Sequence, residues 1–395
     1  MHLSEAPPAP HYFSPDHVQF RATLRDWVAR EIAPYVNEWD EAGGFPRELY
    51  RSAAAMGVIG MGYPEEYGGT PSDIFYSLIA SEELARAGCG GLQSSLLSHS
   101  IGLPPVLNFG SAEMKRRVIP QVLAGSKISA LAVTEPSGGS DVAALKTTAV
   151  RGIDAEGEHY LVNGEKVFIT SGMRADYITV AVRTDPASKG ANGISALLIE
   201  GDTPGLQRTE LKKMGWWAGD TAHLRFDNCR VPAANLIGQE HKGFKTFMTN
   251  FNSERLGMAA LAVGYAQTCF DEALDWARQR STFGELLSQR QVIRHKLMDM
   301  LRQIDAARCL IYDLAWAQQH RAADPAQLVA RICMAKVQGT QCMQFCADAA
   351  VQILGGMGFM RGTKSERIYR EVKVMMIGGG SEEIMKDLAA RQLGI

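Results

Sequence analysis

The sequence predicts an α+β protein made of three successive parts: helical, β, and helical again. Two changes in the spacing of apolar residues support this prediction. The spacing is helical through most of the first 125 residues, alternates as in strands from residue 128 to Val231-Pro232, and is helical again from Gly243 onward. We therefore expect domains at residues 1–127, 128–240 and 241–395.

Composition excludes several classes of protein. At 395 residues the chain can bury a large core, and an apolar share of 46% is typical of globular proteins. A net charge of −2 argues against a nucleic-acid-binding surface. Since no apolar run approaches the roughly 18 residues that a membrane span needs, we expect none.

The seven cysteines are scattered and form no Cys-x-x-Cys pair. We therefore expect no metal site, and we interpret Cys342 and Cys346 as small buried residues of one helix. Residues 1–10 lack the cationic start and apolar stretch of a secretory signal. A reducing cytoplasm is the predicted location.

The first part contains several helix signals. Ser14-Pro15-Asp16 is a plausible helix start, and Ser72-Asp73 is another, with the following helix expected to reach residue 87. A helix is also expected to begin near Pro46, and another over residues 112–123. Tyr67-Gly68-Gly69 is a break.

The second part shows strand patterns. Asn163-Gly164 lies between alternating apolar residues in the stretch 160–168, which predicts a hairpin turn. Further strands are expected over 128–133, 177–182, 193–199 and 223–226. A β region of about 110 residues suits a compact barrel or sandwich. The third part has long helical patterns joined by short turns, which indicates a four-helix bundle.

The most informative segment is 132–141, Ala-Val-Thr-Glu-Pro-Ser-Gly-Gly-Ser-Asp. It follows a predicted strand and offers hydroxyls and backbone N–H groups on a glycine-rich turn. Because glycine has no Cβ, such a turn can approach a flat, polar ligand closely. Taken alone, the segment is equally compatible with an ordinary tight turn.

Three more segments are informative in combination: 166–172 (Lys-Val-Phe-Ile-Thr-Ser-Gly), 278–291 with Arg280, Phe283-Gly284 and Gln291, and 352–359 with Gln352 and Gly355-Gly356. Each has a simple structural explanation. An aromatic residue at a strand end usually packs in a core, an arginine on a helix is usually solvated, and glycine commonly ends helices.

Together and in this order, the four segments resemble the signatures of the acyl-CoA dehydrogenase family, and the resemblance covers essentially the whole chain. It implies the fold of that family: an N-terminal helical domain, a middle β-barrel-like domain and a C-terminal four-helix bundle. It also implies FAD as cofactor. The chain lacks a Gly-x-Gly-x-x-Gly motif after a strand, so FAD binding would not be of the Rossmann type.

The resemblance assigns flavin contacts to particular positions. Val133 and Thr134 would bond to the pyrimidine side of the ring, where donors stabilise the negative charge of reduced flavin. Phe168 stands where the family often has Trp. Arg280 would meet the FAD pyrophosphate of a neighbouring subunit, as a guanidinium fork suits phosphate. The other predicted FAD contacts are Ser140, Ile169, Thr170, Phe283, Gln291, Gln352, Gly355, Gly356, Ser381 and Glu383.

The reaction implied by the resemblance is the α,β-dehydrogenation of an acyl-CoA thioester, as in fatty-acid β-oxidation. A carboxylate removes the α-proton, and the β-hydride passes to flavin N5. Many members carry this carboxylate in a Tyr-Glu-Gly-Thr run near the C-terminus, but Gly379 occupies the position here. Isovaleryl- and long-chain-type members place it in a Glu-Arg pair on a bundle helix, which matches Glu254-Arg255. The alternative for such a pair is a surface ion pair. We predict Glu254 as the base.

Substrate contacts follow from the same resemblance. The backbone N–H of Gly379 would donate to the thioester carbonyl, and burial would raise the pKa of Glu254 toward neutrality. The other predicted substrate contacts are Ser140, Asn252, Ser253, Arg255, Gly380, Leu97 and His99. Leu97 stands where medium-chain-type members have a Glu, which favours a long or branched acyl chain. His99 is either a polar handle in the pocket floor or a structural histidine.

The resemblance also implies partners: electron-transfer flavoprotein as electron acceptor and a homotetramer, because Arg280 would act between subunits. Two alternatives remain open at this stage. One is an acyl-CoA oxidase or flavin mono-oxygenase on the same fold, and the other is a catalytically inactive acyl-CoA-binding protein.

Overall fold

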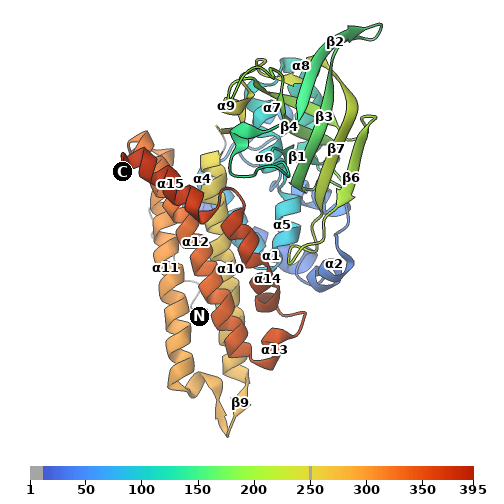
Figure 1. The fold of residues 1–395 in the computed structure, drawn as a ribbon. Helices are drawn as coiled ribbons and strands as arrows, with labels where there is room; N and C mark the ends of the chain where they lie inside the picture. Colours follow the sequence, from blue (N-terminus) through green and yellow to red (C-terminus); the bar gives the residue numbers. More distant parts are fainter. Residues whose placement is uncertain (1–11, 249–250) are drawn as a thin grey trace.

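The computed structural model describes residues 12–248 and 251–395, without the side chains of residues 251 and 252. A group of short helices and a twisted sheet lie together at one end, and long helices extend away from them (Figure 1). The mixed α+β architecture predicted from the spacing of apolar residues is therefore confirmed.

The N-terminal part is helical. Its helices are α1 (Pro15–Glu31), α2 (Val36–Ala42), α3 (Glu48–Ala55), α4 (Ile74–Ala85), α5 (Gly90–Leu96), α6 (His99–Gly102), α7 (Pro104–Phe109) and α8 (Ala112–Leu123). The predicted starts at Ser14 and Asp73 are confirmed, because each side chain accepts a hydrogen bond from a first-turn backbone N–H.

One eight-stranded sheet forms the middle part. Its strands are β1 (Ser129–Ala132), β2 (Thr148–Asp154), β3 (Gly157–Thr170), β4 (Tyr177–Arg183), β5 (Ile194–Glu200), β6 (Leu206–Glu210), β7 (Thr221–Pro232) and β8 (Leu236–Ile237). The order is β6-β7-β3-β2-β4-β5-β8, and β1 pairs in parallel with β4. The loop that follows β1 therefore starts beside the middle of the sheet.

The predicted hairpin turn at Asn163-Gly164 is wrong. Strand β3 runs through both residues, and the turn lies before Gly157, where β2 ends and β3 begins. Asn163-Gly164 instead forms an irregularity at which the pairing of β3 with β7 shifts register. Gly164 has a φ of 142°, and a Cβ there would lie 2.7 Å from the Cα of Thr147. The dipeptide thus serves a bulge and a close backbone approach rather than a turn.

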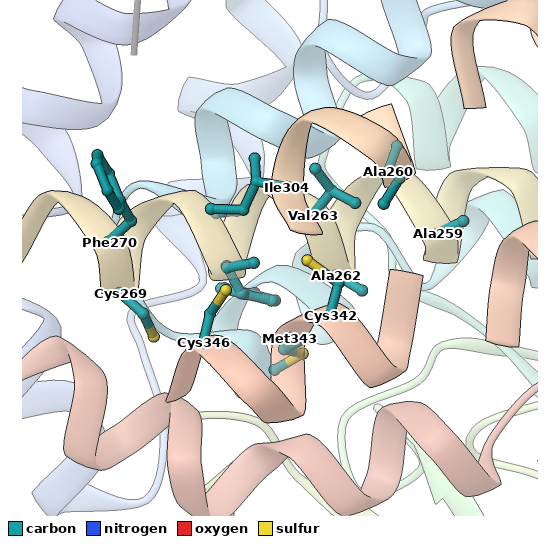
Figure 2. Close-up of a cluster of buried hydrophobic side chains, with 14 of the residues drawn as sticks. Ala259, Ala260, Ala262, Val263, Cys269, Phe270, Ile304, Cys342, Met343 and Cys346 are labelled. Carbon is teal, nitrogen blue, oxygen red and sulfur yellow. The ribbon is translucent and has the colours of Figure 1, made fainter. Parts of the chain in front are cut away.

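The C-terminal part consists of α9 (Gly243–Met248), α10 (Phe251–Gln279), α11 (Gln291–Gln319), α12 (Pro325–Leu354), α13 (Gly356–Phe359), α14 (Lys364–Ile377) and α15 (Glu382–Leu393). A short hairpin of β9 (Ser281–Thr282) and β10 (Glu285–Leu286) joins α10 to α11. Helices α10, α11, α12 and α14 pack together. Cys342 and Cys346 of α12 lie buried against α10 and α11, as Figure 2 shows, and neither forms a disulfide.

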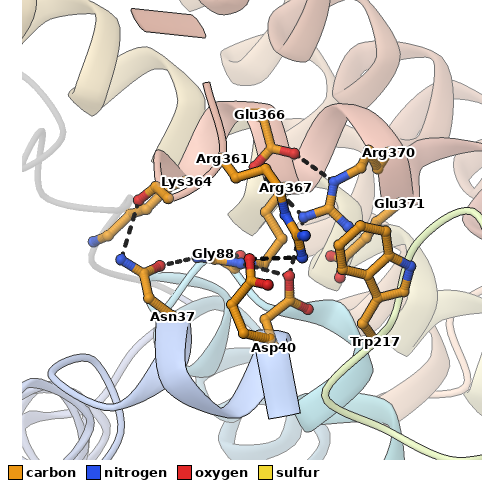
Figure 3. A network of polar contacts seen from close by, with 12 residues as sticks. Asn37, Asp40, Gly88, Trp217, Arg361, Lys364, Glu366, Arg367, Arg370 and Glu371 are labelled. Carbon is orange, nitrogen blue, oxygen red and sulfur yellow. Dashed lines mark hydrogen bonds and ion pairs between the residues drawn. The ribbon is translucent and has the colours of Figure 1, made fainter. Parts of the chain in front are cut away.

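A buried polar network joins the parts (Figure 3). Asp40 of α2 faces Arg370 of α14 at 3.0 Å, and the carboxylate of Glu371 accepts hydrogen bonds from the backbone N–H groups of Gly90 and Trp216. Asp40, Cys89 and Glu371 are close enough to ligate one ion. The guanidinium groups beside Asp40 already supply positive charge there, so the cluster needs no metal to balance it.

Candidate active site

Glu254 lies in the first turn of α10. Burial raises the pKa of its carboxyl to about 7, and the positive charge of Arg255 opposes that shift. The Oε2 atom is shielded from solvent and has no hydrogen-bond partner among the residues that the structure describes. Leaving a buried carboxylate oxygen unpaired is costly in free energy, so this atom is suited to a partner other than the residues that the structure describes.

A loop of three glycines between α14 and α15 lies beside the start of α10. The Nε of Arg255 donates to the carbonyl of Gly379 at 3.4 Å. Gly379 has a φ of 65°, and a Cβ there would lie 2.5 Å from the Sδ of Met258, one helical turn after Glu254. The structure therefore brings the predicted base and Gly379 together at one end of the bundle.

The Gly379 backbone N–H makes no hydrogen bond within the described part of the chain. Its neighbours behave differently, because Gly378 donates to Val374 and the Ser381 side chain caps α15. A backbone N–H without a partner among the described residues, between neighbours that are hydrogen-bonded, is the arrangement expected of a donor to a ligand.

A second group of predicted residues lies where β1 and β3 end. The backbone N–H of Val167 donates to the carbonyl of Thr134 at 2.9 Å, so the loop after β1 lies directly against β3. Phe168 has a φ of 63°, and its side chain is 68% exposed. A positive φ is strained for an aromatic residue, and here it turns the ring out of the sheet. Thr170 is half-buried, whereas the Ile169 side chain is buried in the sheet core. Ile169 can therefore offer a ligand only its backbone.

The position of the loop after β1 depends on two buried charges that the sequence analysis did not single out. Lys166 of β3 is fully buried and donates to the carbonyl of Val133 at 3.0 Å and to Glu135 at 2.8 Å. Glu135 also accepts hydrogen bonds from the backbone N–H groups of Lys146 and Thr147. The sequence did contain a signal for this pair, namely a lysine inside an apolar strand pattern. A buried ammonium needs a carboxylate or carbonyl partner, so such a lysine indicates an ion pair in the core.

A third group lies at the far end of the long helices. Phe283 stands at the tip of the β9–β10 hairpin with its side chain 98% exposed, and Arg280 and Gln291 flank the hairpin and are also exposed. Gln352, Gly355 and Gly356 lie exposed at the end of α12. In Figure 1, β9 and α13 lie at the end opposite to α15.

One chain therefore does not bring all the predicted flavin residues together. From Glu254 to Gln279, α10 rises by about 38 Å at 1.5 Å per residue. Ser381 and Glu383 lie with the first group at the start of α15, apart from Gln352. Ser140 is exposed in the glycine-rich loop after β1.

The remaining predicted substrate residues have diverse surroundings. The Ser253 hydroxyl accepts a hydrogen bond from Gln318 at 3.3 Å. The side chain of Asn252 lies outside the described residues. Leu97 is half-buried against the N-terminal core. His99 is buried, and burial lowers its pKa to about 4, so it is neutral at physiological pH. Its surroundings are those of the structural histidine that the sequence analysis held as the alternative.

Comparison with known proteins establishes the family. Models of the acyl-CoA dehydrogenase N-terminal, middle and C-terminal domains match residues 14–126, 130–229 and 241–394. The mitochondrial long-chain specific acyl-CoA dehydrogenase of Rattus norvegicus is 36% identical over 96% of this chain and 87% of its own length. A solved acyl-CoA dehydrogenase from Geobacillus kaustophilus is 36% identical, with a TM-score of 0.91 over 98% of this chain and 100% of its own. The chain belongs to the acyl-CoA dehydrogenase family and is an oxidoreductase.

The family is FAD-dependent. A solved acyl-CoA dehydrogenase from Bacillus anthracis in complex with FAD is 29% identical, with a TM-score of 0.89 over 98% of this chain and 69% of its own. The residues present fit such a group. Thr134 and Thr170 have hydroxyls for which no hydrogen bond to another described residue is found. Thr134 lies against Val167 of β3, and Thr170 stands two residues after Phe168 on that strand. Within residues 12–248 and 251–395, no helix has the length and apolar character that crossing a bilayer requires.

Proposed function

We propose that this chain oxidises an acyl-CoA thioester to the trans-2-enoyl-CoA, with Glu254 as the base that removes the α-proton. The observation that carries the proposal is the buried Oε2 of Glu254, which has no partner among the described residues, at the end of α10 where the loop of Gly379 lies. The N–H of Gly379 likewise bonds to none of the described residues. Gly379 stands where other family members are expected to carry the carboxylate, and Glu254-Arg255 resembles the Glu-Arg pair of isovaleryl- and long-chain-type members, which supports Glu254 in this role.

The two groups would act on adjacent atoms of the substrate. An α C–H next to a thioester is a weak acid, so its removal needs both a base near neutral pKa and a donor at the carbonyl oxygen, where enolate charge develops. Glu254 supplies the first and the Gly379 N–H the second. One donor of this kind stabilises the transition state by about 2.7–4 kcal/mol in other enzymes. Bound FAD would supply the acceptor for the hydride that leaves Cβ.

The substrate class in this proposal is a long or branched acyl chain. It is supported by the apolar Leu97 and by the similarity to a long-chain specific enzyme. Turnover of straight and branched acyl-CoAs with an artificial electron acceptor tests it. Activity confined to short straight chains would contradict this part of the proposal while leaving the reaction class intact.

We also propose electron-transfer flavoprotein as acceptor, a homotetrameric assembly and domain boundaries after residues 127 and 240. The assembly is supported by the separation of the flavin residues within one chain. Sedimentation of the FAD-loaded protein tests the tetramer. Rapid reoxidation of the reduced protein by air, with release of peroxide, would instead favour an oxidase.

The decisive variant is Glu254→Gln, which keeps the shape of the side chain and removes its basicity. We expect the purified variant to remain yellow with FAD and to lose turnover on the order of 10²–10⁴-fold, as general bases contribute that much. Absorbance of the bound flavin and steady-state kinetics measure the two effects. Turnover close to that of the unmodified protein would refute Glu254 as the base.

A further inference from the structure

A buried ammonium group on α12 has no part in the chemistry described above. The side chain of Lys336 is completely buried. Its Nζ donates to the carbonyl of Met376 at 3.1 Å and to the carbonyl of Gly380 at 2.9 Å. These two carbonyls stand on either side of Gly379, one in the last turn of α14 and the other at the end of the glycine loop.

The charges around Lys336 come from two elements, α15 and α10. Burial lowers its pKa to about 8, whereas the carboxylates of Glu382 and Glu383 on α15 favour its charged form and Arg255 on α10 opposes it. A charged ammonium makes shorter and stronger hydrogen bonds to carbonyl oxygens than a neutral donor does. Lys336 is therefore suited to hold the backbone of this loop.

The loop needs such a tether because its own residues cannot fix it. Gly379 and Gly380 have φ values of 65° and 107°, and glycine loses more conformational freedom on ordering than any other residue. A side chain at either position would be strained by the positive φ, and a Cβ at Gly380 would also displace the Cε of Met385, 2.3 Å away. Gly378 is held by its bond to Val374, but the contact from Arg255 to Gly379 is long at 3.4 Å.

We propose that Lys336 is a positioning residue, which holds the glycine loop so that the Gly379 N–H meets the thioester carbonyl while Glu254 removes the α-proton. The inference rests on the proposed function of Glu254 and Gly379. It predicts that loss of the ammonium slows α-proton removal more than it weakens binding of FAD or acyl-CoA.

The test separates proton removal from oxidation. A 3-thiaacyl-CoA has sulfur in place of Cβ, so its α-proton can be removed but no β-hydride can leave. Exchange of that α-proton with D₂O, followed by mass spectrometry, reports on Glu254 and the Gly379 donor alone. Lys336→Met removes the donor at nearly constant length. Thr340→Val, one turn further along α12 and equally buried, is the matched control, because its hydroxyl donates only to carbonyls of its own helix.

We expect Lys336→Met to keep its FAD content and its affinity for the analogue while α-proton exchange falls on the order of 10²-fold, the loss that a misplacement of about 1 Å causes. Thr340→Val should exchange at the rate of the unmodified protein. Exchange at that same rate in Lys336→Met would overturn the proposal, and so would an equal loss in Thr340→Val.

Two further variants keep the result decisive. If Lys336→Met does not fold, Lys336→Arg takes its place, since the longer guanidinium keeps the charge but displaces the loop. Unchanged exchange in folded Lys336→Arg would then contradict the proposal. Glu254→Gln must abolish exchange. If it does not, the proposed base is wrong, which is a different outcome from failure of Lys336 alone.

Discussion

At Glu254 two effects act on one carboxyl group. Removal from water disfavours the anion and raises the pKa to about 7, while Arg255 favours the anion. The first effect is larger, because the neighbouring charge is not in a direct ion pair with the buried oxygen. A base with a pKa near the working pH can be ionised in the free protein and still accept a proton readily.

The first prediction at this scale is a pH profile. In the proposed mechanism only the ionised form of Glu254 is active, so we expect kcat/KM to rise about tenfold per pH unit below pH 7 and to level off above it. Arg255→Gln removes the positive charge that lowers the pKa of Glu254, so the rising part of the pH profile should move to higher pH. Initial rates between pH 5 and 9 measure both. A limb near the ordinary glutamate pKa of 4.5 would show that Glu254 is not buried in the working enzyme.

The second prediction concerns Gly379. In Gly379→Ala the new Cβ meets Met258 and the φ of 65° becomes strained, so the backbone N–H moves and turnover should fall on the order of 10²–10³-fold. Gly57→Ala is the matched control, since its φ is 78° and nothing lies within 4 Å of the added Cβ. We expect the control to lose stability but not turnover. Steady-state kinetics and thermal unfolding of both variants check this, and equal turnover in the two would exclude a role for the loop position.

At the scale of elements, the loop after β1 and the end of β3 form one unit held by Lys166 and Glu135. Burial lowers the pKa of Lys166 to about 8, and the adjacent ammonium lowers that of Glu135. Removing one partner of such a pair leaves a buried charge, whereas removing both does not. This unit carries Thr134 and Phe168, because Thr134 is hydrogen-bonded to Val167 of β3.

We expect Lys166→Met to lower the free energy of unfolding by about 3–5 kcal/mol and to release FAD more readily. Lys166→Met combined with Glu135→Gln should recover stability, because no buried charge is left unpaired. It should not recover FAD affinity, because the carbonyl of Val133 still lacks its hydrogen bond from Lys166. Arg208→Met is the control, since Arg208 also donates to backbone carbonyls of this domain, those of Met173, Ala175 and Gly201. Urea unfolding and the fluorescence of released FAD measure the effects. FAD release no faster than in the control would contradict a positioning role.

At the scale of the whole molecule, the long helices separate the base from the predicted pyrophosphate contact. Glu254 and Arg280 stand at opposite ends of α10. A single FAD-containing site that uses both residues must therefore take them from two copies of the chain. The exposed Phe283 at the hairpin tip is consistent with a surface that another copy covers.

Mixed oligomers test this arrangement. Glu254→Gln and Arg280→Ala should each be inactive at low FAD, but a dimer containing one copy of each has one site with both residues intact. Random reassembly of an equal mixture should therefore recover about a quarter of the activity, given reciprocal sites in a two-fold dimer. Activity measured before and after dissociation and mixing checks this. No recovery, with confirmed exchange of copies, would place Arg280 and Glu254 outside a shared site.

The local signals in the sequence were reliable where the chemistry is local. Ser14 and Asp73 cap helices because the side chain and the N–H it accepts from are two or three residues apart. The hairpin turn predicted at Asn163-Gly164 was wrong because its structure depends on a strand that is distant in the sequence. A positive φ at the glycine serves a turn and a bulge equally well, and the pairing of β3 with β7 decided between them.

The sequence by itself determined the α+β order and the family resemblance, since these follow from the spacing and the types of residues along the chain. The resemblance in turn implied Glu254 as the predicted base. Only the tertiary structure decided that the loop of Gly379 lies at the start of α10 and is held by Lys336, and that Lys166 holds Val133. It also decided that Arg280 follows the far end of α10, whose rise from Glu254 to Gln279 is about 38 Å. The physical reason is that burial and hydrogen bonding join residues that are distant in the sequence. The spacing of residues along the chain does not indicate which distant segments come into contact.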